Sequence, residues 1–150
     1  MKILVVSDSH GAAERIEEAL FIEKPDVLFH LGDGADDCDG LRLGNISLYR
    51  VCGNNDFGAY QYEEIADISG KRFFLCHGHR YGVRYSYQTL KERAETLGAD
   101  ALLFGHTHEP LCAMEGKTLI MNPGSIRFGG TYGVVTIENG RINGENRLLR

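Results

Sequence analysis

The chain has 150 residues, of which 43% are hydrophobic and 25% are charged, and its formal net charge at pH 7 is −5. This composition predicts one globular domain, residues 1–150, with a buried core. The negative charge and the absence of any lysine- or arginine-rich run disfavour a polynucleotide-binding surface, because such a surface needs clustered cations. No apolar stretch reaches the length of a membrane span, and the short N-terminal apolar run favours a strand over a signal sequence. We therefore expect a cytoplasmic protein.

The first part of the chain alternates strand-like and helix-like segments. A continuous aliphatic run at 3–6 predicts a strand buried on both faces. Apolar residues at helical spacing over 11–24 predict an amphipathic helix that ends at Pro25. Further strands are expected at 27–31 and 46–52, separated by an acidic, glycine-containing loop with a short helix.

The remainder of the chain ends in a series of short strands. We expect a hairpin over 65–76, a second helix over 85–97 and a strand at 101–104. Four short strands should then follow, at 111–114, 117–121, 132–138 and 141–147. Asn139-Gly140 is a strong signal for a two-residue hairpin turn. The pattern predicts an α/β protein in which two sheets pack together with helices outside.

The cysteines and one histidine are predicted to be structural. The four cysteines are Cys38, Cys52, Cys76 and Cys112. They form no C-x-x-C pair, which argues against a thiolate zinc site or a redox motif, so we interpret them as free thiols that are buried or partly buried. His30 falls inside a predicted strand and is expected to be a packed residue rather than a ligand.

Side chains that bind metals follow the ends of several predicted strands. His106 and His108 come directly after the strand at 101–104, and positions two apart on an extended backbone face the same side. Gly105 permits a sharp turn and a close backbone approach there. The other strand ends supply Asp8, His10, Asp33, Asn54 and His77. Because binding groups in α/β folds gather at the carboxyl ends of strands, the sequence predicts a metal site.

Short motifs occur in a characteristic order along the chain. They are Asp8-Ser9-His10, Gly32-Asp33-Gly34-Ala35-Asp36, Gly53-Asn54-Asn55-Asp56, His77-Gly78-His79 and Gly105-His106-Thr107-His108. Together they resemble the motifs of the calcineurin-like metallophosphoesterase superfamily. Asn122-Pro123-Gly124-Ser125 is similar to a further signature of its small bacterial and archaeal phosphodiesterase branch. The resemblance implies a four-layer α/β/β/α sandwich of two mixed sheets flanked by helices.

The resemblance also implies a dinuclear centre. One metal would be held by Asp8, His10, Asp33 and His108, and the other by Asp33, Asn54, His77 and His106. Asp33 would bridge the two ions. The implied cofactors are two divalent ions per chain, with Mn²⁺ as the first expectation and Ni²⁺, Fe²⁺, Co²⁺ and Zn²⁺ as alternatives. A hydroxide bridging the metals would attack the phosphorus of a small phosphodiester.

The chain departs from the family pattern in two places. Asn55 stands where many larger relatives have a histidine proposed to protonate the leaving group, and an amide cannot act as an acid. Asp56 is expected to orient its neighbours, and His79 is a second candidate acid for which a structural role is the stronger expectation. The loop after Ser125 is short and lacks the proline of the branch. Its Arg127 is a candidate phosphate contact, the alternative being a solvent-exposed loop arginine.

Several functions remain open at this point. We expect a metal-dependent phosphodiesterase acting on small phosphodiesters, with a phosphomonoesterase as an alternative. A non-catalytic, protein-binding scaffold of the same fold, such as the retromer subunit, should have lost a metal ligand, and this chain keeps all seven. A nuclease would need a basic track for the nucleic-acid backbone. We thus expect a small phosphodiester as the partner, no polynucleotide and no membrane, with a homo-oligomer possible.

Overall fold

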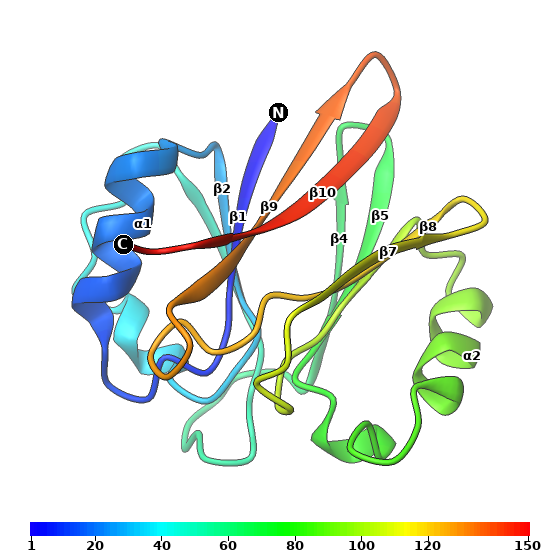
Figure 1. Ribbon diagram of the computed structural model, residues 1–150, viewed down its shortest axis with the longest axis horizontal. Coiled ribbons are helices and arrows are strands. Elements are labelled where there is room, and N and C mark those ends of the chain that lie inside the picture. Colours follow the sequence, from blue (N-terminus) through cyan, green and yellow to red (C-terminus); the bar gives the residue numbers. More distant parts are fainter.

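The computed structural model describes residues 1–150 and consists of two sheets with few helices (Figure 1). The strands are β1 (Lys2–Val6), β2 (Val27–His30), β3 (Ser47–Arg50), β4 (Glu63–Ile68), β5 (Lys71–Cys76), β6 (Ala101–Leu103), β7 (Leu111–Glu115), β8 (Thr118–Asn122), β9 (Thr131–Glu138) and β10 (Arg141–Leu148). The helices are α1 (Ala13–Glu23) and α2 (Gln88–Thr96), with short 3₁₀ helices η1 (Ala35–Cys38) and η2 (His79–Tyr81).

Both sheets are mixed and five-stranded. The first has the order β10-β9-β1-β2-β3 and the second has the order β4-β5-β6-β8-β7. β1, β2 and β3 are parallel, as are β5, β6 and β8. β9, β4 and β7 pair antiparallel with β1, β5 and β8, and the edge strand β10 pairs antiparallel with β9. The parallel strands of each sheet end at one edge, and this edge carries the motifs.

The central strands are buried on both faces, which explains their unbroken apolar sequences. In β1, Ile3 and Val5 face the core between the sheets, whereas Leu4 and Val6 face the layer that contains α1. β5 alternates in the same way, with its inner residues in the central core and its outer residues packed beneath α2. Figure 1 shows the result, with α1 on the left, α2 on the right and the two sheets between them. The predicted α/β/β/α arrangement is confirmed.

The predicted elements are present, with differences at their ends. The second helix begins at Gln88 rather than at residue 85, because the preceding residues form turns in which the amides of Tyr85 and Ser86 donate to the Gly82 carbonyl. The 3₁₀ helix η2 was not predicted. The turn Asn139-Gly140 is confirmed, with both residues at positive φ (52° and 74°), as this hairpin requires. No helix is long and apolar enough to cross a membrane.

Glu23, at the end of α1, is a buried acid that links this helix to the first sheet. Its carboxylate lies 2.7 Å from Lys2 Nζ and 2.7 Å from Arg147 Nη1, and it accepts a 2.7 Å hydrogen bond from the Tyr132 hydroxyl. Burial opposes ionisation, but these partners outweigh it and lower the pKa of Glu23 from 4.5 to about 2.

We expect Glu23→Gln to lower the free energy of unfolding at pH 7 by about 3 kcal/mol. Because the pKa is lower in the folded chain, the stabilisation is fully present above pH 4.5 and is lost as the pH falls towards 2. Urea titrations at pH 7, 4 and 2.5 should show the difference from wild type shrinking with pH. The exposed Glu18→Gln on the same helix is the control and should unfold like wild type. A difference that does not change with pH would contradict this account.

Candidate metal centre

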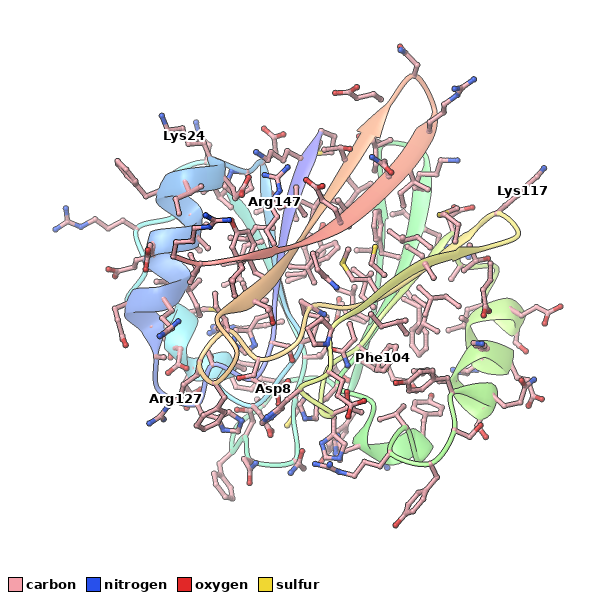
Figure 2. All side chains as sticks on the ribbon, viewed as in Figure 1. Asp8, Lys24, Phe104, Lys117, Arg127 and Arg147 are labelled. Carbon is pink, nitrogen blue, oxygen red and sulfur yellow. The ribbon has the colours of Figure 1, made fainter.

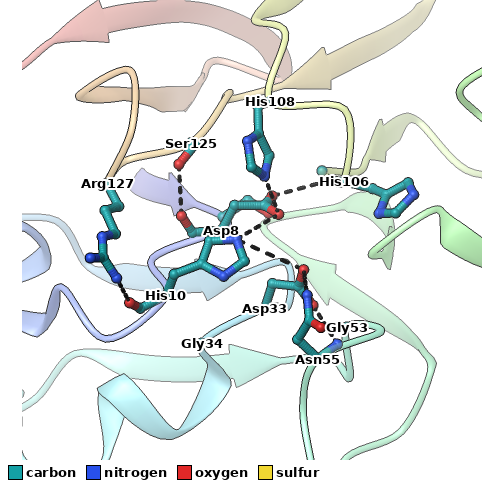
Figure 3. Close-up of polar contacts among 12 residues, drawn as sticks. Asp8, His10, Asp33, Gly34, Gly53, Asn55, His106, His108, Ser125 and Arg127 are labelled. Atoms are coloured by element: carbon teal, nitrogen blue, oxygen red, sulfur yellow. Dashed lines mark hydrogen bonds and ion pairs between the residues drawn. The ribbon is translucent and has the colours of Figure 1, made fainter.

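The motif side chains meet where the parallel strands end. Asp8 follows β1, Asp33 follows β2, His77 follows β5, and His106 and His108 follow β6. Figure 2 places Asp8 and Arg127 towards the lower side of the molecule, with Arg147 and Lys24 on the upper side. Figure 3 shows the close-up, in which the loops that carry His10, His106 and His108 approach the Asp8 and Asp33 carboxylates.

Asp8 is fully buried at the middle of the cluster. Its Oδ1 atom lies 3.1 Å from His108 Nε2, 3.7 Å from His10 Nε2 and 3.8 Å from His77 Nε2. Its Oδ2 atom accepts hydrogen bonds from the Ser7 hydroxyl and from the backbone amide of His106. One oxygen is therefore held by the protein while the other faces three imidazoles.

Asp33 lies between the two predicted sets of ligands. Its Oδ2 atom is 3.9 Å from His10 Nε2 and 3.5 Å from His77 Nε2. On the far side, His106 Nδ1 is 3.3 Å from His77 Nε2 and 3.1 Å from Asn54 Oδ1. The structure thus brings all seven predicted ligands into one connected cluster.

The backbone of this cluster is strained. Five of the seven residues have positive φ: Asp8 (53°), His10 (41°), Asp33 (58°), His106 (70°) and His108 (63°). Residues with a Cβ rarely adopt this conformation, and such strain persists only where surrounding contacts enforce it. Its concentration on the ligand positions marks the cluster as a functional site.

The donor atoms suit divalent cations. Ligand atoms of Asp8, His10 and His108, and likewise those of Asp8, Asp33 and His77, lie within 4.8 Å of one another. His10 Nε2 is buried without a hydrogen-bond partner. His77 donates its Nδ1–H to the Leu31 carbonyl at 2.7 Å, which directs Nε2 to the carboxylates, the usual arrangement of a metal-binding histidine.

The acids and imidazoles shift one another's pKa values. Burial opposes ionisation of Asp33, but hydrogen bonds from His77 and Asn55 hold its pKa well below the usual range. Burial, together with the nearby His77 and Arg84, lowers the pKa of His106 to about 4. An ionised carboxylate beside a neutral imidazole is the state in which both groups bind metals.

Asn55 and Asp56 form hydrogen bonds that position the loops carrying the candidate ligands. The backbone amide of Asn55 donates to Asp33 Oδ1 at 2.8 Å, and its side-chain Nδ2 donates to Asp33 Oδ2 at 2.9 Å. The Asp56 carboxylate accepts from the backbone amides of Asp33, Gly34, Ala35 and Gly53. Asp56 therefore orients its neighbours, as expected, and Asn55 is a direct donor to the bridging candidate.

The Asn122–Ser125 segment supports two of the ligand loops. Asn122 Nδ2 donates to the Gly105 carbonyl and to Thr107 Oγ1, both at 3.0 Å. The Ser125 hydroxyl donates to the Asp8 carbonyl at 2.8 Å (Figure 3). The Asn-Pro-Gly-Ser segment thus positions the loop after β6 and the loop after β1 through hydrogen bonds.

His30 is a packed strand residue, as predicted. It is fully buried, its Nδ1 accepts from the Gly32 amide at 3.1 Å, and its Nε2 lies 2.8 Å from Ser9 Oγ. Ser9 in turn donates to Asp37 Oδ2. Burial lowers the pKa of His30 to about 4, so it remains neutral at pH 7. This network links the loop after β1 to the strand β2 and to the acidic segment after it. It also gives Asp37 of that segment a structural role as a hydrogen-bond acceptor.

His79 and Arg127 lie at the edge of the cluster. The His79 ring is 5.4 Å from the His77 ring, between centroids, and its Nδ1 has no hydrogen-bond partner. The Arg127 guanidinium is exposed, donates to the His10 carbonyl and lies 5.2 Å from the Phe128 ring centroid. Neither residue contacts a ligand atom, so their predicted roles stay predictions.

Sequence reasoning missed two residues beside the ligands. Phe128 stacks on His108 with 5.7 Å between centroids and lies 5.4 Å from His10. Arg84 Nε is 3.2 Å from His106 Nε2. Phe128 follows the Asn-Pro-Gly-Ser motif by three residues, and this spacing is the one signal that points to it. Arg84 lies in a turn outside every motif.

Comparison with known proteins identifies the family. The sequence profile of the calcineurin-like phosphoesterase superfamily domain matches residues 1–140. The chain belongs to this superfamily. It is 31% identical over 147 residues to the probable metallophosphoesterase YsnB of Bacillus subtilis, covering 93% of this chain and 86% of that protein. It is 28% identical over 161 residues to the phosphodiesterase MJ0936 of Methanocaldococcus jannaschii, covering 91% and 90%.

The fold is shared with proteins outside the bacterial and archaeal relatives. A Vps29 variant from Entamoeba histolytica superposes with a TM-score of 0.78 over the whole of both chains, at 20% sequence identity. This likeness shows the fold alone. Family membership makes the chain a phosphoesterase of a metal-binding superfamily, with candidate ligand residues in place.

Gly105 lets two loops approach closely in the centre. A Cβ at this position would lie 2.0 Å from Ser7 Oγ and 2.7 Å from Asp8 Oδ2. We expect Gly105→Ala to displace Asp8 and to weaken metal affinity by roughly tenfold or more, measured by calorimetry. Gly40→Ala is the control, since a Cβ there meets nothing within 4 Å. Unchanged affinity in Gly105→Ala would show that the close approach is unimportant.

Proposed function

We propose that the protein is a divalent-metal-dependent phosphodiesterase that hydrolyses small phosphodiesters at a dinuclear site. The observation that supports the proposal is that two carboxylates, four imidazoles and one amide lie together in one cluster. One of these imidazole nitrogens, His10 Nε2, is buried and has no hydrogen-bond partner. The relative MJ0936 is named as a phosphodiesterase, which supports the same substrate class.

The seven residues divide into two ligand sets. Asp8, His10, Asp33 and His108 would hold one ion, and Asp33, Asn54, His77 and His106 the other. Bound divalent ions would supply positive charge for the phosphoryl oxygens and would lower the pKa of a bound water. The mixture of carboxylate, imidazole and amide ligands suits Mn²⁺ and also admits Ni²⁺, Fe²⁺, Co²⁺ and Zn²⁺.

The surrounding residues favour a diester with a good leaving group. Asn55 donates its amide hydrogens to Asp33 and has no acidic proton for the leaving oxygen. Catalysis should then depend on a leaving group that departs without protonation, such as an aryl oxide. A diester also carries one negative charge where a monoester carries nearly two, so it needs less charge compensation at the site.

A substrate comparison tests this function. Reconstituted protein should hydrolyse bis(4-nitrophenyl) phosphate with a higher kcat/KM than 4-nitrophenyl phosphate, and both far faster than an alkyl phosphomonoester. Chelation should abolish the activity and added Mn²⁺ should restore it. Preference for an alkyl monoester over every diester would favour the phosphomonoesterase alternative and would overturn our proposal.

The structural likeness to Vps29 keeps a scaffold role as the second candidate. A scaffold does not need a connected set of metal ligands, whereas this chain brings all seven together. Folded protein that binds no metal and hydrolyses none of these esters would favour the scaffold.

Arg127→Ala should lower kcat/KM on the aryl diester by roughly tenfold. The guanidinium donates to the His10 carbonyl and is exposed beside the site, so it can support the ligand loop and reach a phosphoryl oxygen. Arg141→Ala removes an exposed arginine of the distant β9–β10 hairpin and is the matched control. Equal kcat/KM values for Arg127→Ala and wild type would leave Arg127 a solvent-exposed loop residue.

A further inference from the structure

A groove of about 590 Å³ opens beside the metal centre. It is lined by residues 61–63, which lead into β4, and by residues 76–81, which include the end of β5 and η2. In Figure 1, η2 belongs to the green segment at the lower edge, between β5 and α2. The predicted ligand His77 is part of the groove wall, so the groove is continuous with the site.

A series of rings leads from the ligands into this groove. The His79 ring lies 6.1 Å from the His106 ring and 5.9 Å from the Tyr62 ring, between centroids. The guanidinium of Arg80 lies 4.3 Å from the Tyr62 ring centroid on the same wall. Stacking on an aromatic ring restricts the orientation of a guanidinium while leaving its N–H edge free to donate hydrogen bonds.

The charge of Arg80 is not neutralised by the protein. No carboxylate lies within 4.0 Å of its guanidinium, a property that it shares with Arg84 and Arg127 near the cluster, whereas Arg50, Arg72, Arg93 and Arg147 form ion pairs. Among these unpaired arginines, Arg80 is the one in the groove wall. The one acid in the groove wall, Glu63, is already engaged by the Tyr81 hydroxyl and by Arg93. Arg80 is therefore an exposed cation that is stacked on Tyr62, unpaired and adjacent to the candidate metal centre, and these features suit an anionic ligand.

We propose that this groove binds the leaving group of the phosphodiester and that Arg80, held on Tyr62, selects leaving groups that carry an oxyanion of their own. The inference rests on the proposed function and narrows its substrate class to esters with a second negative charge, carboxylate or phosphate, beyond the scissile bond. Hydrolysis of such an ester forms one P–O bond from water and breaks the bond to the leaving oxygen. The leaving group departs as its anion, and the proton lost by the attacking water passes to solvent.

A matched set of chromogenic diesters tests the inference. Methyl phosphodiesters of 5-hydroxy-2-nitrobenzoate and of the corresponding neutral benzamide have similar leaving groups that differ in charge. A third ester with a phosphonomethyl group in place of the carboxylate separates the two oxyanions. Each would be assayed at pH 8 with metal-loaded wild type, Arg80→Gln, Tyr62→Phe, Tyr62→Leu and the distant control Arg141→Gln.

Wild type should prefer at least one of the anionic esters over the amide by about tenfold in kcat/KM, mainly through KM. Arg80→Gln and Tyr62→Leu should lose this preference because kcat/KM falls much more on the anionic esters than on the amide, whereas Tyr62→Phe and Arg141→Gln should keep it. Equal rates on the anionic and neutral esters in wild type, or equal losses on all of them in Arg80→Gln, would overturn the inference while leaving the phosphodiesterase intact. Failure to hydrolyse any of the three esters would overturn both.

Discussion

Replacing Asp33 by alanine is expected to remove both metal ions and to lower kcat/KM on aryl phosphodiesters by roughly 10³-fold or more. The carboxylate lies between His10 and His77, at 3.9 Å and 3.5 Å, so it faces both ligand sets. His108→Ala should instead weaken chiefly the one ion that it would share with Asp8 and His10. Metal content after reconstitution, together with steady-state kinetics, measures both effects.

The control for the Asp33 variant removes a charge of the same sign from the neighbouring acidic segment. Asp39 is exposed and pairs with Arg50, so Asp39→Ala should keep its metal and its activity. If Asp33→Ala stayed folded, bound two ions and hydrolysed the diester at the wild-type rate, the bridging assignment would be wrong.

Asn55→Asp is expected to lower kcat/KM on the same ester by roughly 100-fold. The two side chains have nearly the same shape, but the variant places a second carboxylate where Nδ2 now donates to Asp33 at 2.9 Å. Repulsion between the carboxylates should turn Asp33 away from the cluster and weaken metal binding, which titration calorimetry can measure. Asn143→Asp, on an exposed position of β10, introduces the same charge far from the site and should be silent.

The same contact changes the expectation for Asn55→His. From the motif alone, a histidine at this position should supply the missing acid and raise activity on poor leaving groups. In the structure the substitution also removes a hydrogen bond to Asp33, so any gain should be accompanied by weaker metal binding. An isolated gain, with unchanged metal affinity, would show that Asn55 does not position Asp33.

The sequence predicted which candidate ligands come together, because their signal is local. Each candidate follows an unbroken apolar run such as Ile3–Val6 or Ala101–Phe104, and parallel strands of that kind end at a common edge. The order of strand-like and helix-like segments along the chain likewise predicted two packed sheets with helices outside. Neither inference needed knowledge of how the loops pack.

The contacts that hold the ligands in place could not be predicted in this way. Asp56 binds amides more than twenty residues distant in sequence, and the hydroxyl of Ser125 reaches the Asp8 carbonyl across the fold. Such hydrogen bonds depend on how separate loops fold against each other. Arg84 lies in a turn and Arg80 in the short 3₁₀ helix η2, neither of which has a periodic sequence pattern, so their approach to His106 and to Tyr62 has no signal in the sequence.

We expect one chain to assemble a two-metal centre that performs hydrolysis. The most direct test is the metal content of folded wild-type protein after reconstitution and dialysis, with aryl diester hydrolysis measured on the same sample. Two divalent ions should bind to each chain, and the activity should disappear when they are chelated and return when they are restored. Folded protein that takes up no metal, or that hydrolyses the diester equally well without it, would show that no two-metal centre performs the hydrolysis.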